Sequence, residues 1–82
     1  MKLIKISSYD LVESKKLFEQ LEEAFPSINQ IEYDYDLDKE EIKKYGIITK
    51  LPVIILYDND KEISRIVGTK SMEYIYSVIN RN

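Results

Sequence analysis

The stretch that most constrains the fold is GIITKLPVIILYD, Gly46 to Asp58, in which a proline precedes an apolar run. The run from Val53 to Tyr57 has the β-branched and aliphatic composition of a buried strand. Proline lacks the N–H group that a strand ladder needs, so Pro52 belongs at the first residue of a strand, on an edge, at a bulge or in a cis turn. The stretch therefore predicts a strand that begins directly after Pro52.

The residues before this stretch begin with a predicted strand and an amphipathic helix. Lys2 to Ser7 is short and mainly aliphatic, and a polar turn follows it. Apolar or small residues then recur at helical spacing, and this helix face consists of Leu11, Ser14, Phe18, Leu21 and Phe25. Asp10 with Glu13 has the spacing of a helix cap, and Ser8 is the alternative cap. Pro26 then ends the helix.

The middle of the chain predicts a second strand and a short helix. Apolar and acidic residues alternate in the strand, and the helix has an inward face. The inward residues are Ile31, Tyr33 and Tyr35 in the strand, and Ile42 and Tyr45 in the helix. Asp38, with Glu41 three residues later, repeats the cap spacing, and Gly46 suits the left-handed conformation at a helix end.

The last third of the chain predicts a hairpin and a helix, which complete the fold class. Residues 58–61 have turn composition between the strand after Pro52 and a strand from Glu62 to Val67, and Gly68 follows. Ser71 can cap a final helix whose apolar side is Met72, Ile75, Tyr76, Val78 and Ile79. The order β-α-β-α-β-β-α over residues 1–82 predicts one α/β domain. We expect a four-stranded mixed sheet with helices on both faces, the first two strands parallel and the last two an antiparallel hairpin.

Two absences restrict the chemistry more than any motif. The chain contains no cysteine and no histidine. It therefore lacks a thiolate nucleophile, disulfides and soft metal ligands, and no side chain titrates near neutrality without a large pKa shift. We expect no catalytic residues, no cofactor and no metal site. Without histidine, and with Lys15 and Lys16 expected to be solvated, no group is expected to activate Ser14 as a nucleophile.

Charge and hydropathy restrict the partners and the location. Lys and Arg total 12 against 15 Asp and Glu, a net charge of −3, and the basic residues are scattered. This pattern predicts no nucleic-acid binding. No apolar stretch matches a signal peptide or a membrane span, so we expect a cytoplasmic protein without membrane contact. Frequent Lys, Ile, Asn and Tyr are typical of AT-rich bacterial or phage genomes.

Four segments, in order, resemble the thioredoxin and glutaredoxin family. They are Tyr33 to Asp36, Asp38 to Ile47, Leu51 to Tyr57 and Arg65 to Gly68. The family has an acidic stretch closing a strand, a short helix ending in a KKYGI-like sequence, a proline loop, a hairpin and a glycine before its last helix. The chain resembles the short form of the family. The resemblance implies that Pro52 is the family's cis-proline and that Lys50 and Leu51 border a groove for an extended protein segment.

The catalytic motif of that family is missing. An ungapped comparison places the two cysteines of Cys-x-x-Cys at Leu11 and Ser14, and a shift of one residue places them at Asp10 and Glu13. Neither pair contains cysteine, and the tryptophan that usually precedes the motif is also absent. Val53 stands where the family usually has threonine. The resemblance therefore implies a thioredoxin-like fold that cannot perform dithiol–disulfide exchange, because that reaction proceeds through a thiolate.

Two further features have simple structural interpretations. The aspartates at positions 34, 36 and 38 alternate, but a calcium loop starting at Asp34 would need glycine where Lys39 stands and glutamate where Tyr45 stands. They predict a solvated acidic edge. Most of the seven tyrosines are predicted core rings, whereas Tyr9 and one of Tyr74 and Tyr76 are predicted to be exposed.

These observations favour a redox-inactive protein-binding module whose groove surrounds the cis-proline. The predicted groove residues are Tyr9, Asp10, Leu11, Ser14, Lys50, Leu51, Pro52, Gly68 and Thr69. The expected partner is another protein, and the expected state is a monomer or a weak dimer. The alternative is a cysteine-independent binder or enzyme of the same fold, acting on a small anion or glutathione with a hydroxyl of Ser8 or Tyr9. Carboxylates already near the first helix's N-terminus disfavour this alternative.

Overall fold

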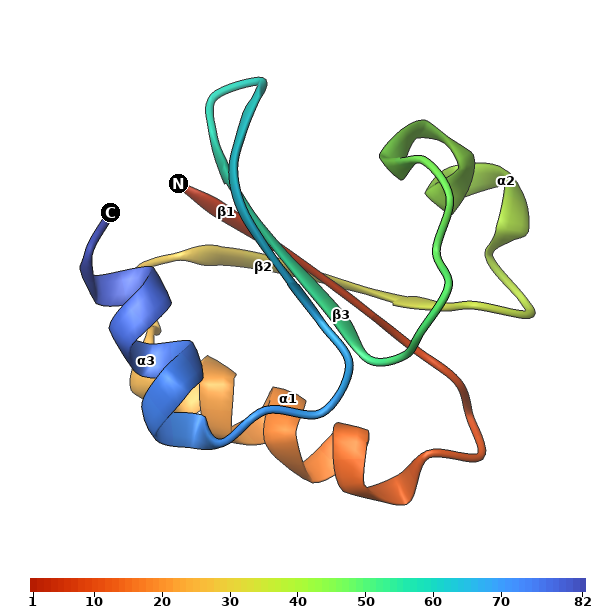
Figure 1. Cartoon of the computed structure of the whole chain (residues 1–82), viewed down its shortest axis with the longest axis horizontal. Coiled ribbons are helices and arrows are strands. Elements are labelled where there is room, and N and C mark those ends of the chain that lie inside the picture. The colour runs from red at the N-terminus through yellow and green to blue at the C-terminus, as the bar shows by residue number, and fades with distance from the viewer.

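A mixed four-stranded sheet forms the centre of the protein (Figure 1). The computed structural model describes all residues, Met1–Asn82. The strands are β1 (Lys2–Ser7), β2 (Asn29–Asp34), β3 (Val53–Asp58) and β4 (Lys61–Val67). The helices are α1 (Val12–Ala24), α2 (Lys39–Ile42), the 3-10 helix η1 (Lys43–Tyr45) and α3 (Met72–Asn80). The predicted order β-α-β-α-β-β-α is confirmed, and β3 begins directly after Pro52.

The strand order is β2-β1-β3-β4. β1 pairs with β2 in parallel, as the helical crossover predicts, and with β3 antiparallel. β3 and β4 form the predicted antiparallel hairpin, whose turn includes Asn59 at a φ of 58°. Ile6 lies opposite Val53, and Val53 lies opposite Val67. The end of β1, the start of β3 and the end of β4 therefore lie at the same end of the sheet.

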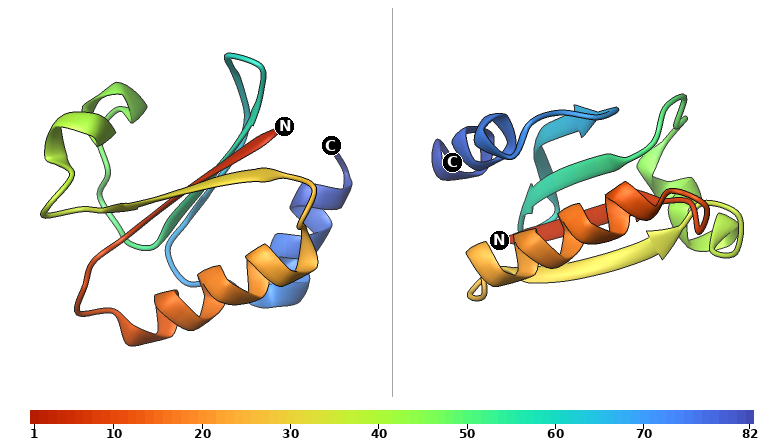
Figure 2. Two further views of the ribbon diagram at one scale, coloured as in Figure 1. Left: turned by 180° about the vertical axis from the view of Figure 1, so that it is seen from behind. Right: turned by 90° about the horizontal axis from the view of Figure 1, so that it is seen from below.

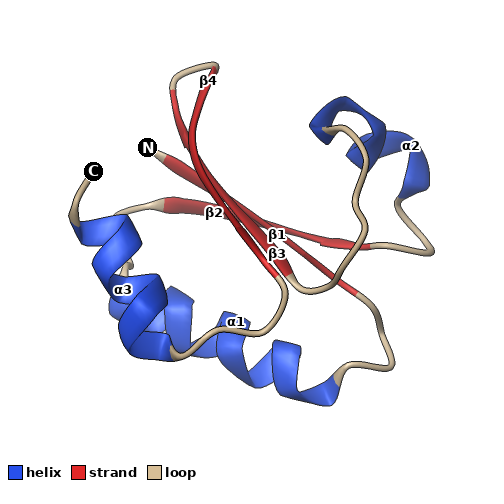
Figure 3. Cartoon of the chain, in the orientation of Figure 1, coloured by secondary structure: helices blue, strands red, loops and turns tan.

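Alternating side chains of the strands build one core on each face of the sheet. Figures 1 and 3 show α1 and α3 together on one side and α2 on the other, and the view from behind in Figure 2 shows the same separation. The core under α1 and α3 contains Leu3, Phe18, Leu21, Ile54, Leu56, Ile66, Ile75, Val78 and Ile79. The core under α2 and η1 contains Ile4, Ile6, Ile42, Tyr45, Val53 and Ile55. None of the helices has the length and apolar character that crossing a bilayer requires.

Two of the three predicted helix caps are wrong. The residue before α1 is Leu11, and no side chain caps this helix. The Asp10 N–H donates to Ser8 Oγ at 3.5 Å, so both predicted caps lie too early in the chain to reach the free amides of the first turn. Asp38 precedes α2, but its Oδ2 accepts from the Asp34 N–H at 2.7 Å. Ser71 caps α3 as predicted and accepts from the Tyr74 N–H at 3.1 Å.

The tyrosines largely follow the prediction. Tyr45 is buried, and the ring centroids of Tyr33 and Tyr57 lie 6.1 and 6.0 Å from its own. Burial raises the pKa of Tyr45 to about 12. Tyr9 and Tyr74 are exposed, as expected of Tyr9 and of one residue of the Tyr74 and Tyr76 pair. β2 ends at Asp34, one residue short of the predicted Tyr35, although the Tyr35 N–H still donates to the Ser7 carbonyl at 2.8 Å.

Lys5 is completely buried between β1 and α1. Its Nζ donates to Gln30 Oε1 at 3.0 Å and to the Phe18 carbonyl at 3.4 Å, and it lies 3.3 Å from Glu22 Oε1. The amide of Gln30 in turn donates to the carbonyls of Leu21 and Phe25 near the end of α1. This network ties the middle and end of α1 to the sheet. The sequence analysis did not single out Lys5, because lysine is rarely buried completely.

Candidate functional site

Three loops meet at the sheet end where β1 finishes and β3 begins. We call residues 8–11, 47–52 and 68–69 the three-loop surface. The register of Ile6, Val53 and Val67 places these loops on adjacent strands. Eight of the nine predicted groove residues belong to this surface, and Ser14 is the exception. Ser14 is only 5% exposed in the first turn of α1, so its side chain faces the interior.

The bond between Leu51 and Pro52 is cis, as the resemblance implies. Pro52 is buried, and its carbonyl accepts from the Gly68 N–H at 2.9 Å. Gly68 has a φ of 81°, and a Cβ placed there would lie 3.7 Å from Cδ of Lys50. The proline loop and the loop after β4 are therefore in direct contact. A side chain at position 68 would be strained by the backbone conformation.

The segment before the cis bond leaves its backbone polar groups unpaired. Residues 47–51 make no backbone hydrogen bond, although they lie between η1 and β3. Lys50 is exposed and Leu51 is half-buried against the core under α2. The segment is irregular and bends at Lys50 and Leu51, and its unpaired N–H and C=O groups are free to pair with a further strand. Whether the nine predicted residues form a working groove stays a prediction.

Large apolar side chains are exposed at the start of α1 and shortly after η1. Tyr9 and Val12 at the start of α1 are 87% and 78% exposed, and Ile47 before the proline loop is 90% exposed. Leu11 is 39% exposed. Exposed apolar side chains that follow one another closely in the chain, as Tyr9, Leu11 and Val12 do, are typical of a contact surface rather than of a core.

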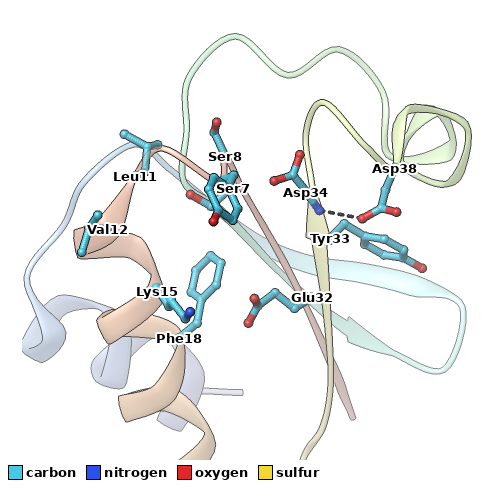
Figure 4. Close-up of a pocket in the computed structure, with 11 residues that line it drawn as sticks. Ser7, Ser8, Leu11, Val12, Lys15, Phe18, Glu32, Tyr33, Asp34 and Asp38 are labelled. Atoms are coloured by element: carbon cyan, nitrogen blue, oxygen red, sulfur yellow. Dashed lines mark hydrogen bonds between the residues drawn. The ribbon is translucent and has the colours of Figure 1, made fainter.

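A cavity of about 510 Å³ lies on the β2 side of the α1 start (Figure 4). Its α1 wall includes Leu11, Val12, Lys15 and Phe18, its β1 side Ser7, Ser8 and Tyr9, and its β2 wall Glu32, Tyr33, Asp34 and Asp38. Of the predicted groove residues, only Tyr9 and Leu11 line this cavity. Sequence analysis missed it because its walls come from two separate segments, residues 7–18 and 32–38, and no local pattern joins them.

The acidic residues after β2 partly serve to shape their own loop. Asp34 Oδ1 accepts from the N–H groups of Asp36 and Leu37 at 2.8 and 3.0 Å. Asp38 Oδ2 accepts from the Asp34 N–H. Asp34 and Asp38 are half-buried and only Asp36 is exposed, so the predicted acidic edge is less solvated than expected. No group of three or more acidic side chains is arranged to hold a metal ion.

Ser7 carries the one fully buried side-chain polar atom that has no hydrogen-bond partner. It is 7% exposed, lines the cavity at the end of β1, and its Oγ has no hydrogen-bond partner. A buried hydroxyl without a partner is uncommon and calls for an explanation. Glu32 and Lys15 on the two walls make no ion pair with each other. Figure 4 shows the Glu32 side chain extending from β2 toward α1.

Comparison with solved structures identifies the fold. The chain is similar to thioredoxin 1 from the thermophile Thermosipho africanus, with a TM-score of 0.86 and 18% identity over 99% of this chain and 92% of that one. It is similar to a malaria parasite thioredoxin-2 described as a component of the protein secretion machinery, with a TM-score of 0.82, 16% identity, and 99% and 82% of the two chains covered. A thioredoxin from Fasciola hepatica matches with a TM-score of 0.78, 17% identity, and 99% and 80% coverage. No family model and no curated protein matches the sequence.

Proposed function

We propose that this cysteine-free protein of thioredoxin-like fold binds an extended segment of another protein at its three-loop surface. The fold is shared with thioredoxins, but without a thiolate the chain cannot perform dithiol–disulfide exchange. What remains of a thioredoxin-like site is its shape and its exposed backbone. The function then rests on recognition rather than on electron transfer.

The observation that carries the proposal is the unpaired backbone of residues 47–51 beside the cis bond at Pro52. An extended peptide laid along this segment would satisfy its N–H and C=O groups, as in recognition by strand addition. Main-chain hydrogen bonds of this kind provide affinity for many sequences. Selectivity must therefore come from the side chains beside the segment.

The apolar side chains of the surface support a partner with apolar anchors. Tyr9 and Leu11 are exposed in the loop before α1, and Leu51, within the proline loop, is half-buried. Exposed aromatic residues carry a large share of binding energy in protein interfaces. Leu11 also stands where the resemblance places a cysteine, which makes this part of the surface more apolar.

The charges near the start of α1 favour this proposal over the glutathione or small-anion alternative. Asp10 and Glu13 are exposed beside the first turn, and Asp36 Oδ2 accepts from the Ser8 hydroxyl at 3.5 Å. A further anion at this helix start would meet carboxylates before it met free amides. Titration with glutathione or phosphate tests the alternative, and amide shifts confined to residues 8–13 would support it against our proposal.

A displayed library of random dodecapeptides provides the probe for the proposal. A selected peptide should shift the NMR amide signals of residues 47–51, and Leu51→Asp or Tyr9→Ala should weaken its binding about tenfold, as loss of an interface anchor does. Leu37→Asp is the matched control, since Leu37 is 81% exposed in the loop after β2 and lies outside the three-loop surface. Unchanged affinity in both Leu51→Asp and Tyr9→Ala, with native circular dichroism, would refute the proposal.

A further inference from the structure

The cavity between α1 and β2 is separate from the three-loop surface in its chemistry. The surface offers backbone groups and apolar side chains, whereas the cavity, which is open to solvent and shares Tyr9 and Leu11 with that surface, adds charged side chains around an apolar base at Phe18, which is only 2% exposed. Its volume of about 510 Å³ is in the range of small-molecule sites, which bind with apolar surface and a few placed polar groups. We propose that this cavity binds a small organic ammonium ion, a primary amine carried on an aromatic or aliphatic body.

The unpartnered hydroxyl of Ser7 is the first reason. Its Oγ is buried at the cavity's β1 side and makes no hydrogen bond within the protein. A hydroxyl oxygen has two acceptor positions, so it can accept from an ammonium group. A buried polar atom left without a partner destabilises the fold, so its presence beside a cavity calls for an explanation. A ligand seated in the cavity would supply that partner.

The imbalance of charge across the cavity is the second reason. Glu32, Asp34 and Asp38 contribute three carboxylates to the β2 wall, and Lys15 is the only cationic side chain that lines the cavity. The exposed side chain of Glu32 takes part in none of the ion pairs of the structure. The cavity walls therefore carry excess negative charge, which favours a cationic ligand over an anionic one.

The strand register explains why Glu32 remains free. Lys5 lies directly opposite Glu32 across the β1–β2 pair. The ammonium of Lys5 is instead committed to Gln30, Glu22 and the Phe18 carbonyl, beneath α1. The nearest cross-strand cation is thus unable to neutralise Glu32. An ammonium ion from outside would pair with Glu32 and reach Ser7 from the same space.

Tryptamine is a suitable probe because the protein contains no tryptophan, so indole fluorescence reports the ligand alone. Tryptophol and indole-3-propionate carry the same ring with a neutral or an anionic end. We expect saturable tryptamine binding that shifts the amide signals of residues 7, 32 and 33, and clearly weaker binding of the other two compounds. Glu32→Gln should weaken tryptamine binding about tenfold, the loss expected for a charge-assisted hydrogen bond.

Two further variants separate the site from general effects of charge and folding. Glu23→Gln removes an exposed carboxylate of α1 that does not line the cavity and should leave tryptamine binding unchanged. Ser7→Ala should weaken binding without lowering the stability of the fold, because it removes an unpaired buried hydroxyl. Binding of the peptide from the library should survive Glu32→Gln, so that failure of this inference and failure of the proposed function remain distinguishable.

Three results would overturn the inference. Equal binding of tryptamine and tryptophol would show an apolar cavity without charge recognition. Tighter binding of indole-3-propionate would show an anion site governed by Lys15. Absence of saturable binding by all three compounds, with a native spectrum, would show that the cavity is not a binding site for this class of ligand.

Discussion

The two helices that share one face of the sheet, α1 and α3, begin in different ways. At the start of α3, the Ser71 hydroxyl accepts from the Tyr74 N–H, and Ile75 in the first turn is buried. At the start of α1, Leu11 offers no side-chain cap and Val12 is 78% exposed. The loops that lead into the two helices leave the same end of the sheet, after β1 and after β4. Only one of them is built as a stable helix start.

This difference agrees with the binding that we propose beside the start of α1. A capped start with a buried first turn stabilises the fold, as in α3. A helix start without a cap and with exposed apolar residues lacks this stabilisation. Such departures from the usual local pattern concentrate at functional sites. α1 forms without an N-terminal cap because its later part is held to the sheet by Phe18, Leu21 and the hydrogen bonds of Lys5. The start of α1 also borders both the three-loop surface and the cavity.

The largest expected contrast between the two starts comes from truncating their apolar side chains. Ile75→Ala should lower the free energy of unfolding by about 2–5 kcal/mol, because it leaves a hole in the core. Val12→Ala should change it by less than about 0.5 kcal/mol, because this side chain is mostly in water. Urea unfolding followed by circular dichroism measures both. Similar losses in the two variants would contradict the contrast.

Removal of the cap of α3 should have an intermediate effect. Ser71→Ala eliminates the hydrogen bond from the Tyr74 N–H and should destabilise the protein by about 1 kcal/mol. Ser71→Asp is the matched control, since aspartate can accept the same hydrogen bond and should restore stability. If alanine and aspartate gave the same midpoint in urea, the cap would not contribute.

The smallest expected effect tests whether the acidic residue before α1 acts as a cap. Asp10→Ala should cost less than about 0.5 kcal/mol, through weaker attraction to the helix N-terminus, because no hydrogen bond to the helix is lost. Salt of about 1 M should remove this small difference by screening. A loss near that of Ser71→Ala, insensitive to salt, would mean that Asp10 caps α1 after all. Comparison of thermal midpoints at low and high salt decides between these outcomes.

Most of the fold was predictable from local patterns. The helical stripe through Phe18 and Leu21, the strand after Pro52 and the turn at residues 58–61 all appear where expected. The failures concern polar side chains. Asp10 and Asp38 have the residue type and spacing of caps, but the residue before α1 is Leu11, and the Asp38 carboxylate accepts from the N–H of Asp34 at the end of β2.

The candidate site was predictable only in part. The resemblance pointed to Pro52 and to the loops beside it, and the register of β1, β3 and β4 brings those loops together. The cavity was not foreseen, since Ser7, Lys15 and Glu32 carry no shared motif. Ser14 was assigned to the surface by its place in a missing motif, whereas the helix turns it inward.

The amino-acid order alone settled the sequence of elements, the absence of thiol chemistry and the faces that must be buried. These are local properties, because the spacing of apolar residues and the identity of each side chain do not depend on distant parts of the chain. Tertiary packing decided which polar groups meet. It buried Lys5, left the Glu32 carboxylate without an ion pair, and placed the Ser7 hydroxyl beside a cavity without a hydrogen-bond partner. Those outcomes depend on register and helix placement, which bring together residues far apart in the chain.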